Sequence, residues 1–163
     1  MGNHLRHSLT KVAEGREGDE YVVTRLGHVQ PALNIVNLYG ENESRAGGKR
    51  IQESWRRLME DLEDIKMRGE VVIVMGDMNR AIGSDELGIP GNKAQVSPGG
   101  RLMREELLRG GEYVLLNGLQ GRGSKVEVVG GPWTWVQPGR EEEVRSCLEL
   151  VVVSASLLPY VTW

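Results

Sequence analysis

The clearest periodic pattern in the chain is an apolar stripe that starts at Ile51. The stripe consists of Ile51, Trp55, Leu58, Leu62 and Ile65, which recur at steps of four, three, four and three residues. This spacing places side chains on one face of an α-helix. Acidic residues at positions 60, 61, 63 and 64 fall on the outer side, as a solvated face requires. We therefore predict an amphipathic helix that ends before Gly69, a residue type that favours the left-handed position after a helix.

Short apolar runs on both sides of this helix predict strands. Tyr21 to Leu26 and Leu33 to Tyr39 come first, and we expect them to pair as a hairpin. Alternation in the second run puts Leu33, Ile35 and Asn37 on one face, and neither face of that run is purely polar, so we expect both to be covered. Val71 to Met75 is a continuous apolar run, which is typical of a central strand.

The second half of the chain is predicted to add a helix and further strands. The helix covers Arg101 to Arg109, and the strands cover Tyr113 to Leu116, Val126 to Val129, Trp133 to Val136 and Leu148 to Val153. Residues Arg80 to Gly100 are rich in Gly, Pro, Asn and Ser, which predicts a long surface loop. The order of strands and helices predicts an α/β fold, and 163 residues suit a single domain.

Charge and cysteine content narrow the possible functions. The formal net charge is -3, so no broad positive field favours nucleic acid or an anionic membrane, although a bound metal ion can invert the local charge. The single cysteine, Cys147, cannot form an internal disulfide and is interpreted as a buried thiol in a reducing compartment. No apolar stretch has the length of a signal peptide core or a membrane span. We expect an intracellular protein of the nucleus or cytoplasm with no membrane contact.

A Gly-Asp-x-Asn turn follows the predicted central strand. It consists of Gly76, Asp77, Met78 and Asn79. Functional residues in α/β sheets gather at the carboxyl-terminal ends of strands. There Asp77 can accept a proton and Asn79 can donate to a phosphate oxygen. The alternative is an ordinary turn, because Asp and Asn also bond their own backbone.

Four spaced segments resemble motifs of the endonuclease/exonuclease/phosphatase family. They are IVNLYGENESR from Ile35, VVIVMGDMN from Val71, GGPWTWVQP from Gly130 and RSCLELVVVS from Arg145. The likeness is greatest to the endonuclease-like domains of retroelements and to AP-endonuclease-like proteins. It implies a two-sheet α/β sandwich, incomplete here, with residues 1–163 as a single partial domain. It also implies hydrolysis of DNA phosphodiester bonds with a divalent metal, usually Mg²⁺, and hence DNA as a partner.

The resemblance also implies roles for single residues. Tyr39 would hydrogen-bond the scissile phosphate, Asp77 would orient or deprotonate the attacking water, and Asn79 would hold phosphate oxygens. Glu149 stands where the family has an Asp that orients a catalytic His. Each has a plainer alternative, which is a core-capping aromatic for Tyr39 and a solvent-facing strand residue for Glu149.

Both ends of the chain depart from the family pattern. Nothing before Tyr21 matches the strands that supply an Asn and the metal-binding Glu, and the chain stops at Trp163, before an Asp-His pair. His4, His7 and His28 follow no matching strand and are interpreted as solvent-exposed. The metal ligands are therefore unknown, and we expect a truncated enzyme that is inactive or weak. The alternative is a non-catalytic relic or interaction protein that keeps the centre of the fold.

Overall fold

The computed structural model describes residues 9–13, 21–40, 48–80, 82, 96–116, 135–136, 145–146 and 149–161. The strands are β1 (Leu9–Ala13), β2 (Tyr21–Leu26), β3 (Leu33–Leu38), β4 (Val71–Asp77), β5 (Tyr113–Leu115), β6 (Trp135–Val136), β7 (Arg145–Ser146) and β8 (Glu149–Ser154). The helical segments are α2 (Gly48–Met67), α3 (Pro98–Leu102), the π-helical η1 (Met103–Leu108) and the 3-10 helix η2 (Ala155–Tyr160).

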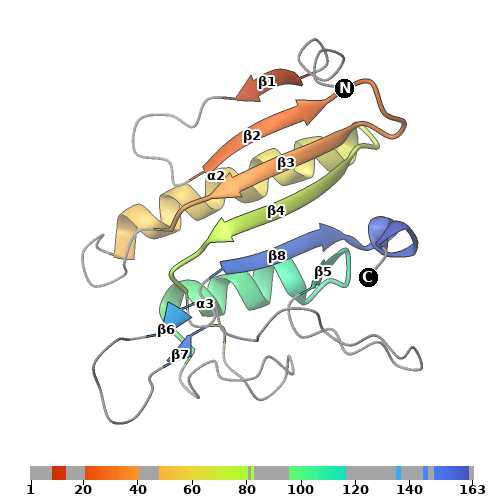
Figure 1. The fold of residues 1–163 in the computed structure, drawn as a ribbon. Coiled ribbons are helices and arrows are strands. Elements are labelled where there is room, and N and C mark those ends of the chain that lie inside the picture. The colour runs from red at the N-terminus through yellow and green to blue at the C-terminus, as the bar shows by residue number, and fades with distance from the viewer. Residues whose placement is uncertain are drawn as a thin grey trace, which may run out of the picture.

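The strands form a mixed six-stranded sheet in the order β1-β2-β3-β4-β8-β5, and β6 and β7 form a separate two-stranded ladder (Figure 1). Strands β3 and β4 run parallel and are connected through α2, whereas the other neighbours in the large sheet are antiparallel. The predicted α/β class is confirmed, as is the hairpin of β2 and β3, in which Tyr21 pairs with Leu38. The predicted strand Val126 to Val129 and Cys147 lie outside the described residues.

One face of the large sheet is covered by α2 and by α3 with η1, which lie on the same side of it (Figure 1). The predicted stripe on α2 is the buried one: Ile51, Trp55, Leu58, Leu62 and Ile65 are all buried. They face alternate residues of the strands, among them Val36, Val72 and Val74. The helix ends as predicted, because Gly69 has a φ of 67°. Tyr21 also donates a hydrogen bond to Asp61 on α2, at 2.7 Å.

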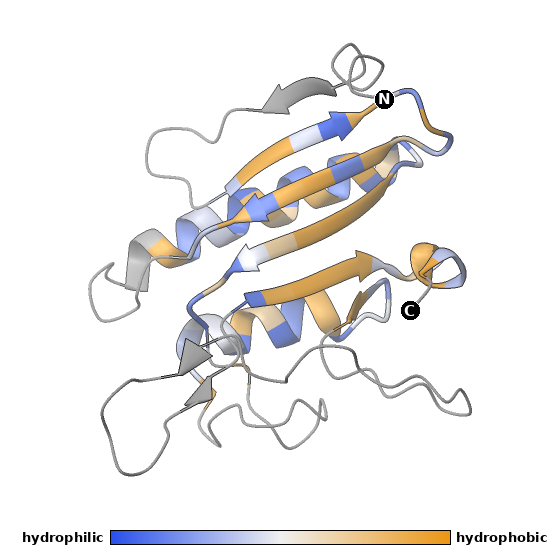
Figure 2. Cartoon of the chain, in the orientation of Figure 1, coloured by the Kyte–Doolittle hydropathy of each residue, from blue (hydrophilic) through white to orange (hydrophobic). Residues whose placement is uncertain are grey.

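The opposite face, which we call the open face, carries the other alternate residues of the strands. Leu33, Ile35, Ile73 and Val151 on it are partly buried, whereas Val22, Asn37 and Met75 are exposed. The predicted alternation in β3 is therefore confirmed, but the expectation that both of its faces are covered is wrong at Asn37. Figure 2 shows β4 and β8 as hydrophobic along most of their length, turning hydrophilic where β4 ends and β8 begins.

The predicted surface loop from Arg80 to Gly100 is wrong at both of its ends. Arg80 and Ile82 are buried, and helix α3 already begins at Pro98. Ser97 caps this helix, because its side-chain oxygen accepts a hydrogen bond from the Gly100 amide at 3.1 Å. A composition rich in Gly, Pro and Asn predicted a loop, but it did not reveal the burial of Arg80 and Ile82.

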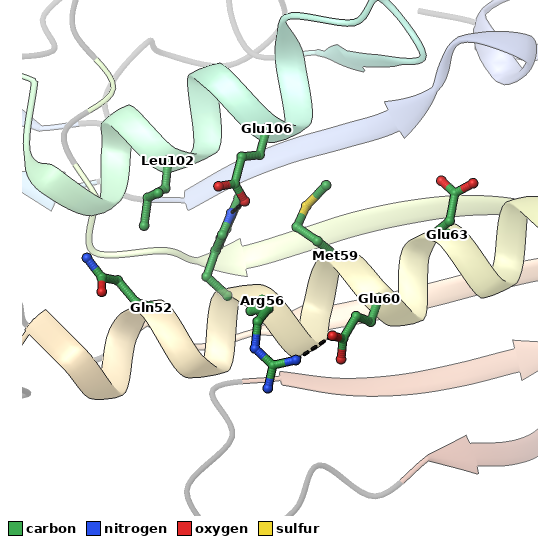
Figure 3. A pocket seen from close by; sticks show the side chains of 8 residues that line it. Gln52, Arg56, Met59, Glu60, Glu63, Leu102 and Glu106 are labelled. Atoms are coloured by element: carbon green, nitrogen blue, oxygen red, sulfur yellow. Dashed lines mark hydrogen bonds and ion pairs between the residues drawn. The ribbon is translucent and has the colours of Figure 1, made fainter.

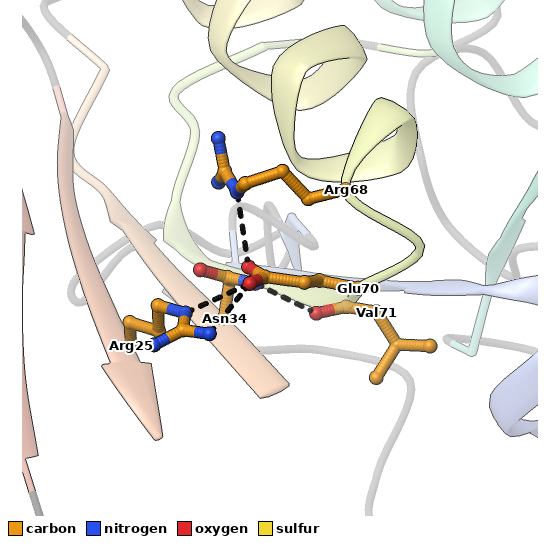
Figure 4. A network of polar contacts seen from close by, with 5 residues as sticks. All are labelled: Arg25, Asn34, Arg68, Glu70 and Val71. Atoms are coloured by element: carbon orange, nitrogen blue, oxygen red, sulfur yellow. Dashed lines mark hydrogen bonds and ion pairs between the residues drawn. The ribbon is translucent and has the colours of Figure 1, made fainter. Parts of the chain in front are cut away.

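A partly buried carboxylate directly before β4 links this strand to β2 and β3 (Figure 4). Glu70 accepts hydrogen bonds from Arg25 on β2, at 2.9 and 2.7 Å, and from Asn34 on β3, at 2.9 Å. Arg68 adds an ion pair at 3.4 Å. The Arg25 contact is the main reason that the pKa of Glu70 falls to about 2. This network fixes the start of β4 against the hairpin.

Candidate functional site

The turn after β4 is shaped by two residues with positive φ angles. Gly76 has a φ of 136°, and a Cβ atom there would lie 2.1 Å from the Leu38 carbonyl oxygen, so only glycine fits. Asn79 has a φ of 46°, and its backbone N–H donates to the Asp77 Oδ1 atom at 3.0 Å. The predicted alternative, a turn in which Asp bonds nearby backbone, is therefore present as a structural feature.

The same turn is joined to the end of β3 through Gly40. The Gly40 N–H donates to the Asp77 carbonyl oxygen at 2.8 Å, and the Gly40 carbonyl oxygen accepts a hydrogen bond from Asn79 Nδ2, also at 2.8 Å. A Cβ atom on Gly40 would lie 2.2 Å from the Met78 carbonyl oxygen. This backbone clamp holds the neighbouring Tyr39, a residue that is 68% exposed, at the same end of the sheet.

Glu149 is the first residue of β8 and pairs directly with Asp77 on β4. Directly opposed residues of antiparallel strands point to the same face, with Cβ atoms about 5 Å apart. The Glu149 residue is exposed and Asp77 is intermediate in burial. Two carboxylates therefore stand side by side on the open face, where β4 ends.

The structure thus brings all four predicted site residues to one end of the sheet. Strand alternation places Tyr39, Asp77 and Glu149 on the open face, and Asn79 follows in the turn. These contacts establish where the four residues lie, whereas their catalytic roles stay predictions. His28 is exposed in the β2–β3 connection, at the other end of the sheet. His4 and His7 lie outside the described residues.

Three residues around the site were not singled out from the sequence. Gly40 has a sequence signal, because it directly follows a predicted strand that ends in Tyr39. Arg80 is 2% exposed directly after Asn79, and no sequence signal marks it, since arginine is seldom fully buried. Asn37 was placed on the correct face of its strand, but its exposure was not predicted.

Among the described residues, no three His, Cys, Asp or Glu side chains gather as a metal-binding group. The pair of Asp77 and Glu149 is a smaller donor set. Mg²⁺ in proteins is commonly held by one or two carboxylates, with water and substrate phosphate oxygens as its other ligands. Two opposed carboxylates fit this mode of binding.

A pocket of about 510 Å³ lies elsewhere, between α2 and η1 (Figure 3). Trp55 and Met59 contribute to its lining, and the Trp55 indole N–H donates to Glu106 at 2.8 Å. Arg56 and Glu60 form an ion pair at its rim. Because this pocket is on the helical side of the sheet, it does not include the four predicted site residues.

Comparison of the chain with protein-family models and with curated proteins gave no match. Within the described part of the chain, no helix is both long and apolar enough to cross a membrane.

Proposed function

We propose that the end of the sheet at Asp77 is the active site of a metal-dependent phosphodiesterase of the endonuclease/exonuclease/phosphatase type that acts on DNA. The observation that carries this proposal is the direct pairing of Asp77 with Glu149 on the open face. Asn79 and Tyr39 stand beside this pair through the clamp at Gly40.

Each side chain has chemistry suited to phosphate hydrolysis. Asp77 uses one oxygen for the Asn79 N–H, which leaves the second oxygen to orient and deprotonate a water. Asn79 uses one amide N–H for the Gly40 carbonyl, which leaves the other to bond a phosphate oxygen. The exposed Tyr39 hydroxyl donates to the same phosphate. Aligned groups of this kind stabilise the charge that develops on the phosphate in the transition state.

A Mg²⁺ ion would be held by Asp77 and Glu149, and it would supply the positive charge that neutralises the phosphate oxygens. This role of Glu149 differs from the orientation of a catalytic His that the resemblance implies. The chain has a net charge of -3, so attraction of DNA to this site depends on such an ion. Glu149 is one methylene longer than the Asp of the family pattern, which is the physical reason to expect weak activity. Catalytic groups tolerate displacements of only about 0.5 Å.

We also propose that the fold is a two-sheet sandwich, in which a second sheet packs on the open face. The inner part of the open face carries Ile35, Ile73 and Val153, which pair across neighbouring strands. Apolar rows of this kind are typical of the inner face of a sandwich, where a second sheet packs about 10 Å away. A site at the end of β4 would then lie at the rim of the two sheets.

A second candidate is a non-catalytic protein that keeps this fold. It is favoured by the turn itself, because the Asp77 and Asn79 side chains both bond backbone groups there and would be retained for folding alone.

The two candidates are separated by Mg²⁺-dependent nicking of supercoiled DNA. Weak nicking that requires Mg²⁺ and is lost in Asp77→Ala supports the phosphodiesterase. Asp64→Ala, which removes an exposed carboxylate from α2, is the matched control and should nick like the unchanged protein. Absence of Mg²⁺-dependent nicking, or equal nicking by Asp77→Ala, favours the non-catalytic protein.

A further inference from the structure

A row of four side chains crosses the open face next to the candidate site. Val22 on β2 pairs with Asn37 on β3, Asn37 with Met75 on β4, and Met75 with Val151 on β8. We call these residues the second row, because they lie one step inward from Asp77 and Glu149. The next row inward, Thr24, Ile35, Ile73 and Val153, is intermediate or buried throughout.

The apolar residues of the second row are more exposed than their neighbours in the next row inward. Val22 is 40% exposed and Met75 is 39% exposed. Exposure therefore rises from the centre of the open face towards the candidate site.

Asn37 is the single polar residue of the second row. It is exposed, and within the described contacts its side-chain amide has no hydrogen-bond partner. Its Oδ1 atom would be 3.1 Å from a Cβ on Gly76, so the amide leans towards β4. An amide buried under a second sheet without partners would be costly. The covered part of the open face should therefore end before Asn37, which leaves the second row facing the site.

We infer that the second row is a nucleotide subsite, in which Asn37 hydrogen-bonds a nucleotide beyond the two that flank the scissile phosphate while Val22 and Met75 contact its base or sugar. The inference rests on the proposed function. Strand spacing puts Asn37 roughly 8 Å from Asp77, since neighbouring strands are ~4.8 Å apart and two residues rise ~6.7 Å. Successive nucleotides of a DNA strand rise about 3.4 Å. Asn37 is thus about two to three nucleotides from the phosphate bound at Asp77.

The amide of Asn37 suits a nucleotide because it both donates and accepts hydrogen bonds. It can pair with the edge of a base or donate to a phosphate oxygen. Apolar side chains on either side offer a surface to the flat face of a base. A subsite of this kind increases the affinity only for ligands that are long enough to reach it.

The test compares two probes of different length, thymidylyl-thymidine and the hexanucleotide of thymidine, titrated into the full chain with Mg²⁺ and followed by NMR. Probe integrity is checked after each titration. The variants are Asn37→Ala, Asn79→Ala and, as a matched amide deletion, Gln52→Ala, which removes an exposed amide on α2.

For the unchanged chain we expect the hexanucleotide to bind about 10-fold tighter than the dinucleotide, the factor expected of one added hydrogen bond and its flanking contacts. In Asn37→Ala this ratio should fall to about 2-fold with dinucleotide affinity unchanged, since one hydrogen bond is lost. Asn79→Ala should weaken both probes and keep the ratio, and Gln52→Ala should change neither.

The outcomes separate the two proposals. If the ratio of hexanucleotide to dinucleotide affinity is unchanged in Asn37→Ala while Asn79→Ala weakens the binding of both probes, the subsite is overturned and the proposed function stands. If Asn37→Ala weakens both probes equally, Asn37 belongs to the phosphate site and its assignment to a more distant nucleotide is wrong. If the unchanged chain binds neither probe, both proposals fail.

Discussion

The side-chain amide of Asn79 donates to the backbone carbonyl oxygen of Gly40 over 2.8 Å, and this bond joins the end of β4 to the end of β3. The Gly40 N–H returns a bond to the Asp77 carbonyl oxygen. The candidate site therefore depends on backbone contacts of a glycine that carries no chemistry of its own.

Gly40→Ala should destabilise the chain and disturb the site. The new Cβ would lie 2.2 Å from the Met78 carbonyl oxygen, and relief requires the clamp to open. We expect a loss of roughly 2 kcal/mol in unfolding free energy, as for other backbone clashes. Urea unfolding measures it. Gly110→Ala is the control, because a Cβ there meets nothing within 4 Å. Equal stability of the two variants would show that the clamp is unimportant.

Asn79→Gly should separate the structural role of Asn79 from its proposed chemistry. Glycine accepts the positive φ of 46° without strain, so we expect stability to fall by only about 1 kcal/mol for the lost hydrogen bond. Mg²⁺-dependent nicking should fall ~100-fold or more, the usual effect of removing a transition-state donor. Thermal melting and nicking are measured on the same sample. Retained nicking would exclude the phosphate-binding role.

Glu149→Asp should raise nicking, because it restores the shorter carboxylate opposite Asp77. We expect an increase of about 10-fold, which is part of the effect of a well-placed catalytic group. Glu60→Asp makes the same substitution at an exposed position on α2 and should change nothing. A decrease in Glu149→Asp would mean that the longer carboxylate is the better placed one, which contradicts the proposed cause of weak activity.

Stability should depend on pH through Glu70. Its pKa is lowered from 4.5 to about 2, so its contribution is fully present above pH 4.5 and is lost as the pH falls towards 2. The contribution is on the order of 2 kcal/mol, since one pKa unit corresponds to ~1.4 kcal/mol and Arg25 is partly screened. Glu70→Gln should flatten the dependence of unfolding free energy on pH between 4.5 and 2. If the slope of unfolding free energy against pH is unchanged in this variant, groups other than Glu70 cause the acid sensitivity.

The exposed second row should also cause weak self-association. Val22 and Met75 offer apolar surface on an open sheet face, and such surface favours contacts between molecules. Gel filtration over a range of concentrations should show dimers or larger species. The double variant Val22→Thr, Met75→Thr should shift them towards monomer. A monomer at all concentrations for the unchanged chain would argue against this surface as a contact site.

Local patterns predicted most of the elements that surround the site. The stripe from Ile51 to Ile65 specifies a helix, because among regular structures only the α-helix places residues at this spacing on one face. The run from Val71 specifies a buried strand. The motif resemblance predicted Tyr39, Asp77 and Asn79, which lie together because β3 and β4 are parallel neighbours.

The remaining features depend on contacts between distant segments. β8 is inserted between β4 and β5, and this order sets Glu149 against Asp77. The local periodicity of a sequence does not predict which strands pair with one another. Burial of Arg80 and the requirement for glycine at position 40 arise from atoms of other segments, so residue type alone could not reveal them.

The hydrogen bond from Gly40 to Asp77 has a consequence for the entropy of ligand binding. Tyr39 is held between β3 and this bond, so its backbone is already ordered, while the residue is 68% exposed. A ligand that contacts the ring must therefore restrict only two side-chain torsions and need not order a loop. Ordering a residue's backbone costs ~1 to 2 kcal/mol, and that cost is met when the chain folds. The ring is thus carried on an ordered backbone in the unbound protein, whichever ligand the site accepts.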